Sequence, residues 1–301
     1  MASSTPIPAA AQFPGAVPPP IGAWRRTLRL LRIHPLGAAG SAVVILLVAM
    51  ALFAPLLSPY DPVAQDADSV LHSPGAEHWL GADNLGRDIW SRIAFGARVS
   101  LGVGFLSVLL GSAVGALAGV VGGYYGRYVD AALQQAADAL LAFPTLVLAL
   151  GIMAVLGAST ANVILAIALV QAPRAARVVR SQALAVSNAE YVAAARIVGA
   201  GSPRVVLRHV LPHCVAPFLV ISTSALGAAI VLEASLSFLG LGVPAPAPSW
   251  GGMLAGPGRD YFNAAPWMAL WPGLAISLAV YGFNLLGDAL RDVLDPRQRP
   301  V

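Results

Sequence analysis

Long stretches without a charged residue constrain this chain more than any other feature of its sequence. Such runs cover residues 33–60, 99–126 and 139–173, and two further apolar segments lie near 217–237 and 272–290. Charged residues make up only 11% of the 301 positions, against about a quarter in an average soluble domain. About 20 apolar residues in a helix cross the roughly 30 Å hydrocarbon core of a bilayer. The sequence therefore predicts an all-α integral membrane protein.

The longest charge-free run predicts a break between two spans. Residues 139–173 are 35 uncharged positions, and one helix of that length would measure about 52 Å, well beyond the hydrocarbon core. We expect the run to turn at 157–162, where the sequence reads Gly-Ala-Ser-Thr-Ala-Asn. The prediction is then six transmembrane helices: 36–57, 99–126, one on each side of this turn, 217–237 and 272–290.

These boundaries divide the chain into segments. We expect residues 1–34 to form a disordered cytoplasmic tail with a basic segment, because the first 23 carry six prolines and no charge. Residues 35–57 are the expected first transmembrane helix, and 58–98 an outer loop. Residues 99–292 are the expected core of five transmembrane helices with a polar loop at 187–212, and 293–301 a cytoplasmic tail.

The basic residues predict orientation and exclude several kinds of chemistry. All 18 are arginine, and with the N-terminus inside, 14 lie in inner segments and only Arg87, Arg92, Arg98 and Arg259 outside. The positive-inside rule therefore predicts that both termini are cytoplasmic. The absence of lysine excludes a P-loop nucleotide site and a Schiff-base enzyme. A single cysteine, Cys214, excludes an internal disulfide and a cysteine-based zinc site.

Four glycines recur at four-residue spacing in the second predicted span, at Gly111, Gly115, Gly119 and Gly123. They form a smooth ridge along one helix face, which lets another backbone approach closely in lipid. We favour packing within this chain over a dimer seam as its role. The ridge itself predicts no chemistry.

The polar loop between the fourth and fifth spans predicts a short helical elbow. Ser187 and Glu190 have the spacing of a capping box, Gly199 permits a turn, and Pro203 is suited to the first position of a second helix running toward Pro212. Residues 193–195 are all alanine, so the first helix presents a small-residue surface. Glu190 is then either only a cap or part of a knob that docks on a cytoplasmic partner.

At this loop the chain resembles the permeases of ABC importers. Glu190-Tyr191-Val192, Ala194-Ala195-Arg196 and Gly199 look like the EAA loop of that family. Further matching motifs, in order, are His78-Trp79-Leu80-Gly81, Asp83-Asn84-Leu85-Gly86-Arg87-Asp88, Gly96-Ala97-Arg98-Val99-Ser100-Leu101, Leu236-Ser237-Phe238-Leu239-Gly240-Leu241-Gly242, Ser249-Trp250-Gly251 and Gly287-Asp288-Ala289-Leu290-Arg291-Asp292. From Arg25 onward the chain resembles the second permease subunit of dipeptide, oligopeptide and nickel importers.

The resemblance implies the type I ABC importer permease fold and a transport subunit that is not itself an enzyme. It implies a heterodimer with a homologous permease, two cytoplasmic ATPase subunits that use ATP and Mg, an extracytoplasmic substrate-binding protein, and the lipid of the bacterial inner membrane. This chain would bind no cofactor, metal or nucleic acid. In the family the EAA loop seats in a groove of the ATPase subunit, so the implied coupling residues are Glu190, Tyr191, Ala194, Ala195, Arg196, Gly199 and Pro212.

The chain departs from the family pattern at four positions. Ala82 stands where threonine is usual, Ala172 where tryptophan is frequent, and His213 where asparagine is common. Gln135 stands where the family often has an arginine, which puts in doubt any ion pair made by that arginine with a nearby aspartate. None of these changes alters the coupling loop.

Two further features leave alternatives open. Glu233 is the one glutamate inside a predicted span, and a charge at mid-bilayer costs about 2.5 kcal/mol or more. It therefore either lines the substrate path or makes a hydrogen bond between helices. His209 and His213 have the i, i+4 spacing of metal ligands, but with no third ligand nearby we favour a structural role.

The predicted function is that of a permease subunit moving di- or oligopeptides across the cytoplasmic membrane. Import of nickel or another small solute is the alternative. A secondary transporter without an ATPase is the rival class, and it would show several intramembrane ionisable residues or broken helices in both halves. A membrane-embedded enzyme would need clustered His, Asp or Glu at membrane depth. We also expect the acidic outer loop to suit basic patches on a binding protein.

Overall fold

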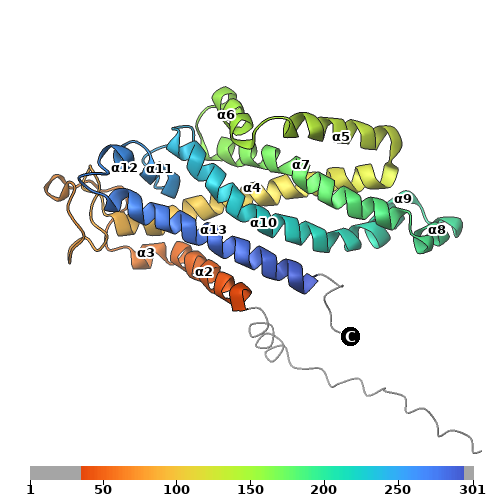
Figure 1. Ribbon diagram of the computed structural model, residues 1–301, viewed down its shortest axis with the longest axis horizontal. Helices are drawn as coiled ribbons and strands as arrows, with labels where there is room; N and C mark the ends of the chain where they lie inside the picture. The colour runs from red at the N-terminus through yellow and green to blue at the C-terminus, as the bar shows by residue number, and fades with distance from the viewer. Residues whose placement is uncertain (1–34, 295–301) are drawn as a thin grey trace, which may run out of the picture.

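The computed structural model describes residues 35–294 as a bundle of helices joined by loops (Figure 1). The expectations for residues 1–34 and 295–301 lie outside the described residues. The elements, in chain order, are α2 (Pro35–Leu52), α3 (Ala54–Leu57), η1 (Ala67–Ser69), α4 (Ile89–Tyr125), α5 (Arg127–Leu141), α6 (Thr145–Leu156), α7 (Thr160–Ser187), α8 (Glu190–Ile197), α9 (Ser202–Val205), η2 (Val206–Val210), α10 (Leu211–Phe238), α11 (Trp250–Leu254), α12 (Pro257–Asp260) and α13 (Trp267–Leu294).

The bundle has two distinct ends. In Figure 1, α2 begins and α13 finishes well short of the end at which α8 and α9 protrude. We call the end with α8 and α9 the elbow end. Residues 58–88 and helices α11 and α12 gather at the opposite end, which we call the loop end. The alternation of helix directions thus points the predicted inner segments toward the elbow end and the predicted outer segments toward the loop end.

Six spans are present if one of them is a broken helix. Five helices are long and apolar enough to cross a membrane, and α5 with α6 makes a sixth span that bends by 92°. The predicted third span, a single helix within 139–156, is therefore wrong. Alone, the 12 residues of α6 would reach only about 18 Å. Pro144, which has no N–H and restricts the residue before it, accounts for the break.

Several predicted boundaries also need correction. The outer loop ends at Asp88, not at residue 98, because Asp88 caps α4 by accepting a hydrogen bond from the Ser91 amide. Helix α7 continues to Ser187 instead of ending at residue 173, with Pro173 inside it. The fifth span begins before Pro217, since Ser202–Phe238 is one long helical run.

Ion pairs let α7 continue through its arginines. Arg180 donates to Asp130 and Arg177 donates to Asp138, both on α5. These pairs join α5 to α7 directly, although Gln135 stands where the family often has an arginine. Because Arg177 and Arg180 each have an opposite charge on the neighbouring helix, the polar half of α7 remains helical where the sequence analysis expected a loop.

The glycine ridge of α4 faces α7 within the same chain. A Cβ built on Gly115 would lie 2.2 Å from the carbonyl oxygen of Ala172, and one on Gly111 would lie 2.5 Å from that of Ala168. The same geometry recurs at Gly119, and at Gly123 the ideal Cβ would meet the Ala183 Cβ at 2.7 Å. The two backbones are in direct contact along the ridge, as expected of small-residue packing in lipid.

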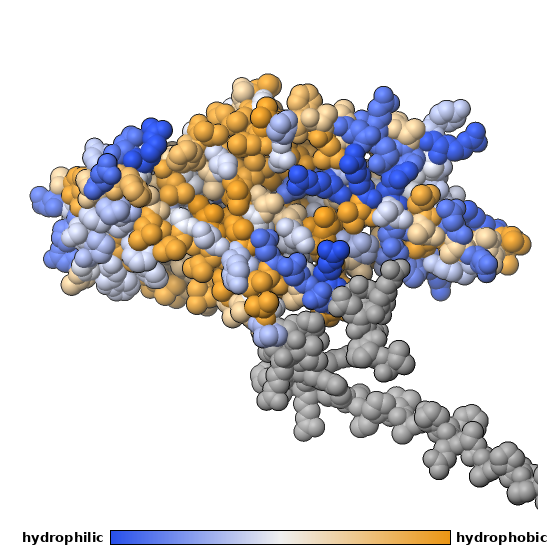
Figure 2. All heavy atoms as spheres, in the orientation of Figure 1, coloured by the Kyte–Doolittle hydropathy of each residue, from blue (hydrophilic) through white to orange (hydrophobic). Residues whose placement is uncertain are grey.

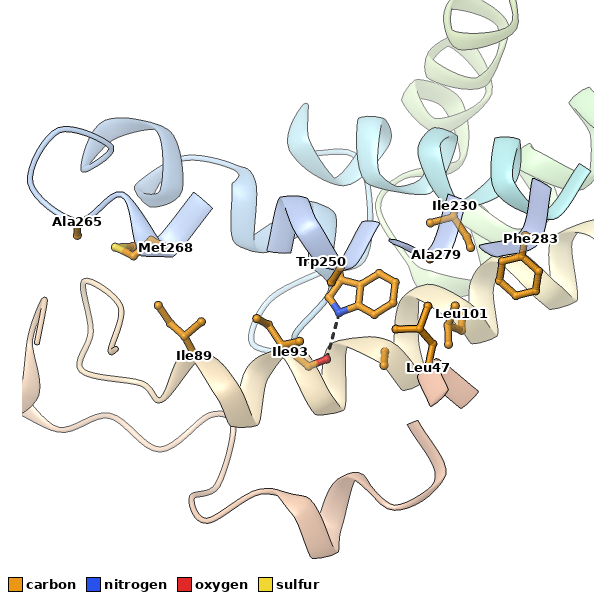
Figure 3. Close-up of a cluster of buried hydrophobic side chains, with 12 residues drawn as sticks. Leu47, Ile89, Ile93, Leu101, Ile230, Trp250, Ala265, Met268, Ala279 and Phe283 are labelled. Atoms are coloured by element: carbon orange, nitrogen blue, oxygen red, sulfur yellow. Dashed lines mark hydrogen bonds between the residues drawn. The ribbon is translucent and has the colours of Figure 1, made fainter. Parts of the chain in front are cut away.

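Two tryptophans hold the loop end together. The Trp250 indole, fully buried, donates a hydrogen bond of 3.1 Å to the Ile93 carbonyl of α4 (Figure 3). The Trp250 amide donates to Ser100 Oγ on the same helix, and Trp267 Nε1 donates to the Ala82 carbonyl. Residues far apart in the sequence are thereby joined: the motif Ser249-Trp250-Gly251 packs on α4, and the start of α13 packs on the predicted outer loop.

Two acidic side chains of the predicted outer loop bond to basic side chains of the same loop. Asp88 is buried and lies 2.9 Å from His78 Nδ1, and Asp83 lies 2.7 Å from Arg87 Nε. These two aspartates therefore cannot offer free charge to a partner, contrary to our expectation for the loop as a whole. Asp61, Asp66, Asp68 and Glu77 remain exposed.

The surface has the distribution expected of a membrane protein. Figure 2 shows a broad apolar band across the middle of the bundle, with hydrophilic side chains at both ends. On the face shown, hydrophilic side chains also reach from the elbow end toward the middle.

Candidate coupling elbow and transport cavity

The elbow is built by α8 and a left-handed glycine. Gly199 has φ +88°, a conformation that side chains other than glycine rarely adopt. The predicted capping box is wrong: the first cap residue of α8 is Ala189, and no side chain caps the helix. Ser187 instead ends α7 with its hydroxyl buried and unpartnered. Because α7 extends through Ser187, this residue is not free to begin the next helix.

Three side chains attach α8 to the rest of the bundle. Val192 is completely buried in a core with residues of α4, α7 and α10. The Arg196 guanidinium lies over the Tyr124 ring of α4 at 5.1 Å, a cation–π geometry. Tyr191 lies 6.1 Å and 6.2 Å, ring to ring, from His209 and His213. The elbow is therefore linked both to the end of α4 and to the start of α10.

The opposite side of the elbow is exposed and apolar. Ile197 is 86% exposed and Val198 is 84% exposed, while Glu190 and Ala194 are also exposed. Adjacent exposed apolar residues on a protruding element are typical of a protein-binding surface. Sequence reasoning missed Ile197 and Val198; their position directly before the turn glycine was the available signal.

The second half of the elbow merges with a transmembrane helix. After α9, residues Val206–Val210 form a π-helical turn that passes straight into α10. Pro212 lies in the first turn of α10, where a missing N–H is tolerated, so it does not separate a loop helix from the fifth span as predicted. Helices α9 and α10 are therefore parts of one continuous helical run.

A large cavity opens beside this junction. It has a volume of about 710 Å³ and lies between α7, the first half of α10 and the end of α13. Its polar lining comes from Gln182, His213, Ser224 and Arg291, and Pro212 also contributes to its wall. Arg291 and His213 are close to the helix ends, so the cavity belongs to the elbow end of the bundle.

Glu233 lies elsewhere, near the loop end of α10. It is completely enclosed, and its Oε1 accepts a hydrogen bond of 2.8 Å from Ser237. The hydroxyls of Ser100 and Ser249, from α4 and the start of α11, also interact with the carboxylate, while Oε2 has no hydrogen-bond partner. Glu233 is therefore enclosed within the bundle, and it does not line the large cavity.

The two histidines of the elbow are aromatic neighbours of Tyr191 in the structure. Within residues 35–294, no group of three or more His, Cys, Asp or Glu side chains is arranged to hold a metal ion.

Comparison with known proteins identifies the family. Residues 111–300 match the family described as binding-protein-dependent transport system inner membrane component, and residues 22–74 match the N-terminal transmembrane domain of oligopeptide transport permease C. The chain belongs to the binding-protein-dependent ABC permeases. Permeases of this family are membrane subunits without an ATPase site of their own, and they work with ATPase subunits and a substrate-binding protein.

Related permeases match over nearly the whole chain. The dipeptide transport system permease protein DppC of Alkalihalophilus pseudofirmus is 41% identical, covering 94% of each chain. A putative peptide transport system permease protein of Brucella abortus is 44% identical, covering 90% of this permease and 91% of that protein. The glutathione transport system permease protein GsiD of Pectobacterium atrosepticum is 44% identical, covering 91% and 90%.

The fold is that of an ABC importer permease. An inward-facing structure of the MetNI methionine ABC transporter superposes with a TM-score of 0.55 at 18% identity, covering 69% of this permease and 97% of that chain. The likeness confirms the predicted fold class. The permease is thus a multi-pass membrane subunit of an ATP-driven importer.

Proposed function

We propose that this permease imports peptides of two or a few residues. Identities of 41–44% over at least 90% of this chain to dipeptide, peptide and glutathione permeases carry the proposal. All three kinds of substrate share a peptide backbone with a free carboxylate. The nickel alternative has no comparable support among these relatives.

The permease would lie in the bacterial cytoplasmic membrane with both termini inside. Six spans, counting the α5–α6 pair as one, together with the excess of arginine at the elbow end, support this orientation. A homologous second permease would complete a heterodimer around the path. A substrate-binding protein would dock at the loop end, where Asp61, Asp68 and Glu77 are exposed.

The elbow would be the docking knob for one of two ATPase subunits. Its exposed side carries Glu190, Ala194, Ile197 and Val198, and Gly199 forms the turn. When the ATPases close on ATP with Mg, the force on α8 would reach α4 through Arg196 and α10 through Tyr191 and Pro212. Because α10 and α7 form walls of the large cavity, this movement would open and close the inner part of the path.

A glycine substitution tests the docking knob. Gly199→Asp places a bulky charge at a position that demands a left-handed backbone. We expect the variant to reach the membrane but to lose peptide uptake or to fail to retain the ATPase subunits during purification. The measurements are uptake of a radiolabelled dipeptide into proteoliposomes and the subunit composition of the purified complex.

Gly157→Asp is the matched control. Gly157 also has a left-handed φ, +81°, and open space where a Cβ would stand. It lies between α6 and α7, at the end of α7 that is away from the elbow. Both variants carry the same kind of backbone strain, so only a role specific to the elbow separates them. Wild-type uptake by Gly199→Asp would overturn the coupling assignment.

A further inference from the structure

A second, smaller cavity lies deeper in the bundle. Its volume is about 110 Å³, and α4, α7 and α10 supply its walls. Ile221 and Ser224 line both this cavity and the large one, so the two adjoin. The small cavity is polar on one side, where Ser112, Gln171 and Arg174 meet.

Arg174 is an exposed arginine that lines this cavity. It occupies the midpoint of α7, a helix whose ends reach both sides of the bundle. Its guanidinium donates one hydrogen bond of 3.3 Å to Thr145 Oγ1, and it forms no ion pair with a carboxylate among the described residues. Arg177 and Arg180, on the following turns, each pair with an aspartate of α5. An arginine that lines a cavity and has no carboxylate partner can offer its charge to an anionic occupant.

Two buried polar side chains beside it lack partners. Gln171 is 6% exposed and Ser112 is 1% exposed, yet the side chain of neither makes a hydrogen bond within residues 35–294. Their polar atoms are not themselves enclosed, although most of each side chain is. Both line the small cavity, so both have hydrogen-bonding capacity available to whatever occupies it.

We propose that the small cavity binds the free carboxylate of a peptide during its passage. Arg174 supplies the charge, Gln171 and Ser112 donate hydrogen bonds, and the volume of about 110 Å³ accommodates a carboxylate with its neighbouring atoms but not a whole peptide. The remainder of the peptide extends into the large cavity. Arg174 is then a specificity-determining residue within the path, which rests on the proposed function of peptide import.

Paired substrates test this assignment in the complete transporter. The complex, reconstituted in proteoliposomes with its binding protein, is given a tripeptide with a free carboxylate or the same tripeptide as its carboxy-terminal amide. Because one binding protein delivers both peptides to every variant, its own preference cancels when acid-to-amide uptake ratios are compared. We expect Arg174→Gln to lower this ratio about tenfold, the equivalent of one charge-assisted hydrogen bond.

Further variants separate binding from folding. Arg174→Lys keeps the charge and should leave the acid-to-amide uptake ratio close to that of wild type. Gln171→Leu should lower this ratio without changing the net charge. The midpoint of thermal unfolding should not fall in Arg174→Gln, since the side chain has only one contact with Thr145 to lose. An unchanged ratio, or an equal loss of both uptakes, would overturn the carboxylate site. Failure of the wild-type complex to transport either peptide would overturn the proposed function, and the site with it.

Discussion

Replacing Gly115 by alanine should destabilise the bundle at its closest helix contact. The new Cβ would lie 2.2 Å from the Ala172 carbonyl oxygen, 2.8 Å from the Ala175 Cβ and 3.0 Å from the Ala176 amide nitrogen. Two of these atoms belong to the backbone of α7, so no rotamer change relieves the contact. The helices have to separate, and overpacking of this kind costs about 1–3 kcal/mol.

Gly102 provides a control within the same helix. An alanine Cβ at Gly102 meets nothing within 4 Å. Both substitutions gain the higher helix propensity of alanine, about 1 kcal/mol. That gain cancels when the two variants are compared, and the difference in free energy of unfolding is the cost of the steric contact alone. Gly102→Ala should be as stable as wild type or more so.

The single cysteine of the chain reports the unfolding. Cys214 is 2% exposed in α10, so a thiol-reactive fluorogenic dye labels it only when the bundle opens. At about 2–4 °C per kcal/mol, the midpoint for Gly115→Ala should lie roughly 2–12 °C below that for Gly102→Ala. Equal midpoints would refute the inference that the ridge holds α4 against α7.

Two further predictions concern the loop end. Trp250→Phe removes the donor to the Ile93 carbonyl and leaves that acceptor buried, so the variant should lose about 1–3 kcal/mol of stability, seen as a lower midpoint in the same dye assay; an unchanged midpoint would contradict the predicted role. Asp88→Ala removes the α4 cap and the partner of His78, and should lose about 2 kcal/mol or more. Limited proteolysis between residues 58 and 88 should accelerate in this variant, and resistance equal to wild type would contradict the prediction.

The membrane class and four of the spans could be predicted from sequence because they depend on local composition. Charge-free runs long enough to cross a bilayer identify α2, α4, α10 and α13 without reference to any neighbour. The turn at 157–162 also lies where expected, between α6 and α7, since a run of small and polar residues ends an apolar helix locally.

The third span could not be predicted in the same way. From composition alone, residues 139–156 are predicted to form one apolar helix. The structure forms this span from an amphipathic helix and a short apolar one, with Pro144 at the bend. Charged residues on α5 are stable at this depth because α7 supplies their partners, which is a property of two helices together.

The elbow was partly predictable. Gly199 predicts a turn in any context, because glycine permits the left-handed backbone and this one lies between two segments that favour helices. The predicted capping box at Ser187 was wrong because α7 continues through this residue. Packing of α7 against α4 favours that continuation over the start of a new helix. The attachments of Arg196 to Tyr124 and of Tyr191 to the two histidines join residues from separate elements, so no local pattern indicates them.

The sequence by itself determined that this chain crosses a membrane, how its arginines are distributed among the segments, and that it has no P-loop nucleotide site. Hydrophobicity, arginine distribution and the lack of lysine are sums over residues and need no fold. Tertiary structure alone decided what the polar residues within the bundle do. Glu233 is enclosed by serines, whereas Arg174, counted at first among loop residues, lies unpaired beside a cavity. Inside a membrane the free energy of a charge is set by the groups that face it, and those groups are known only once the helices have packed.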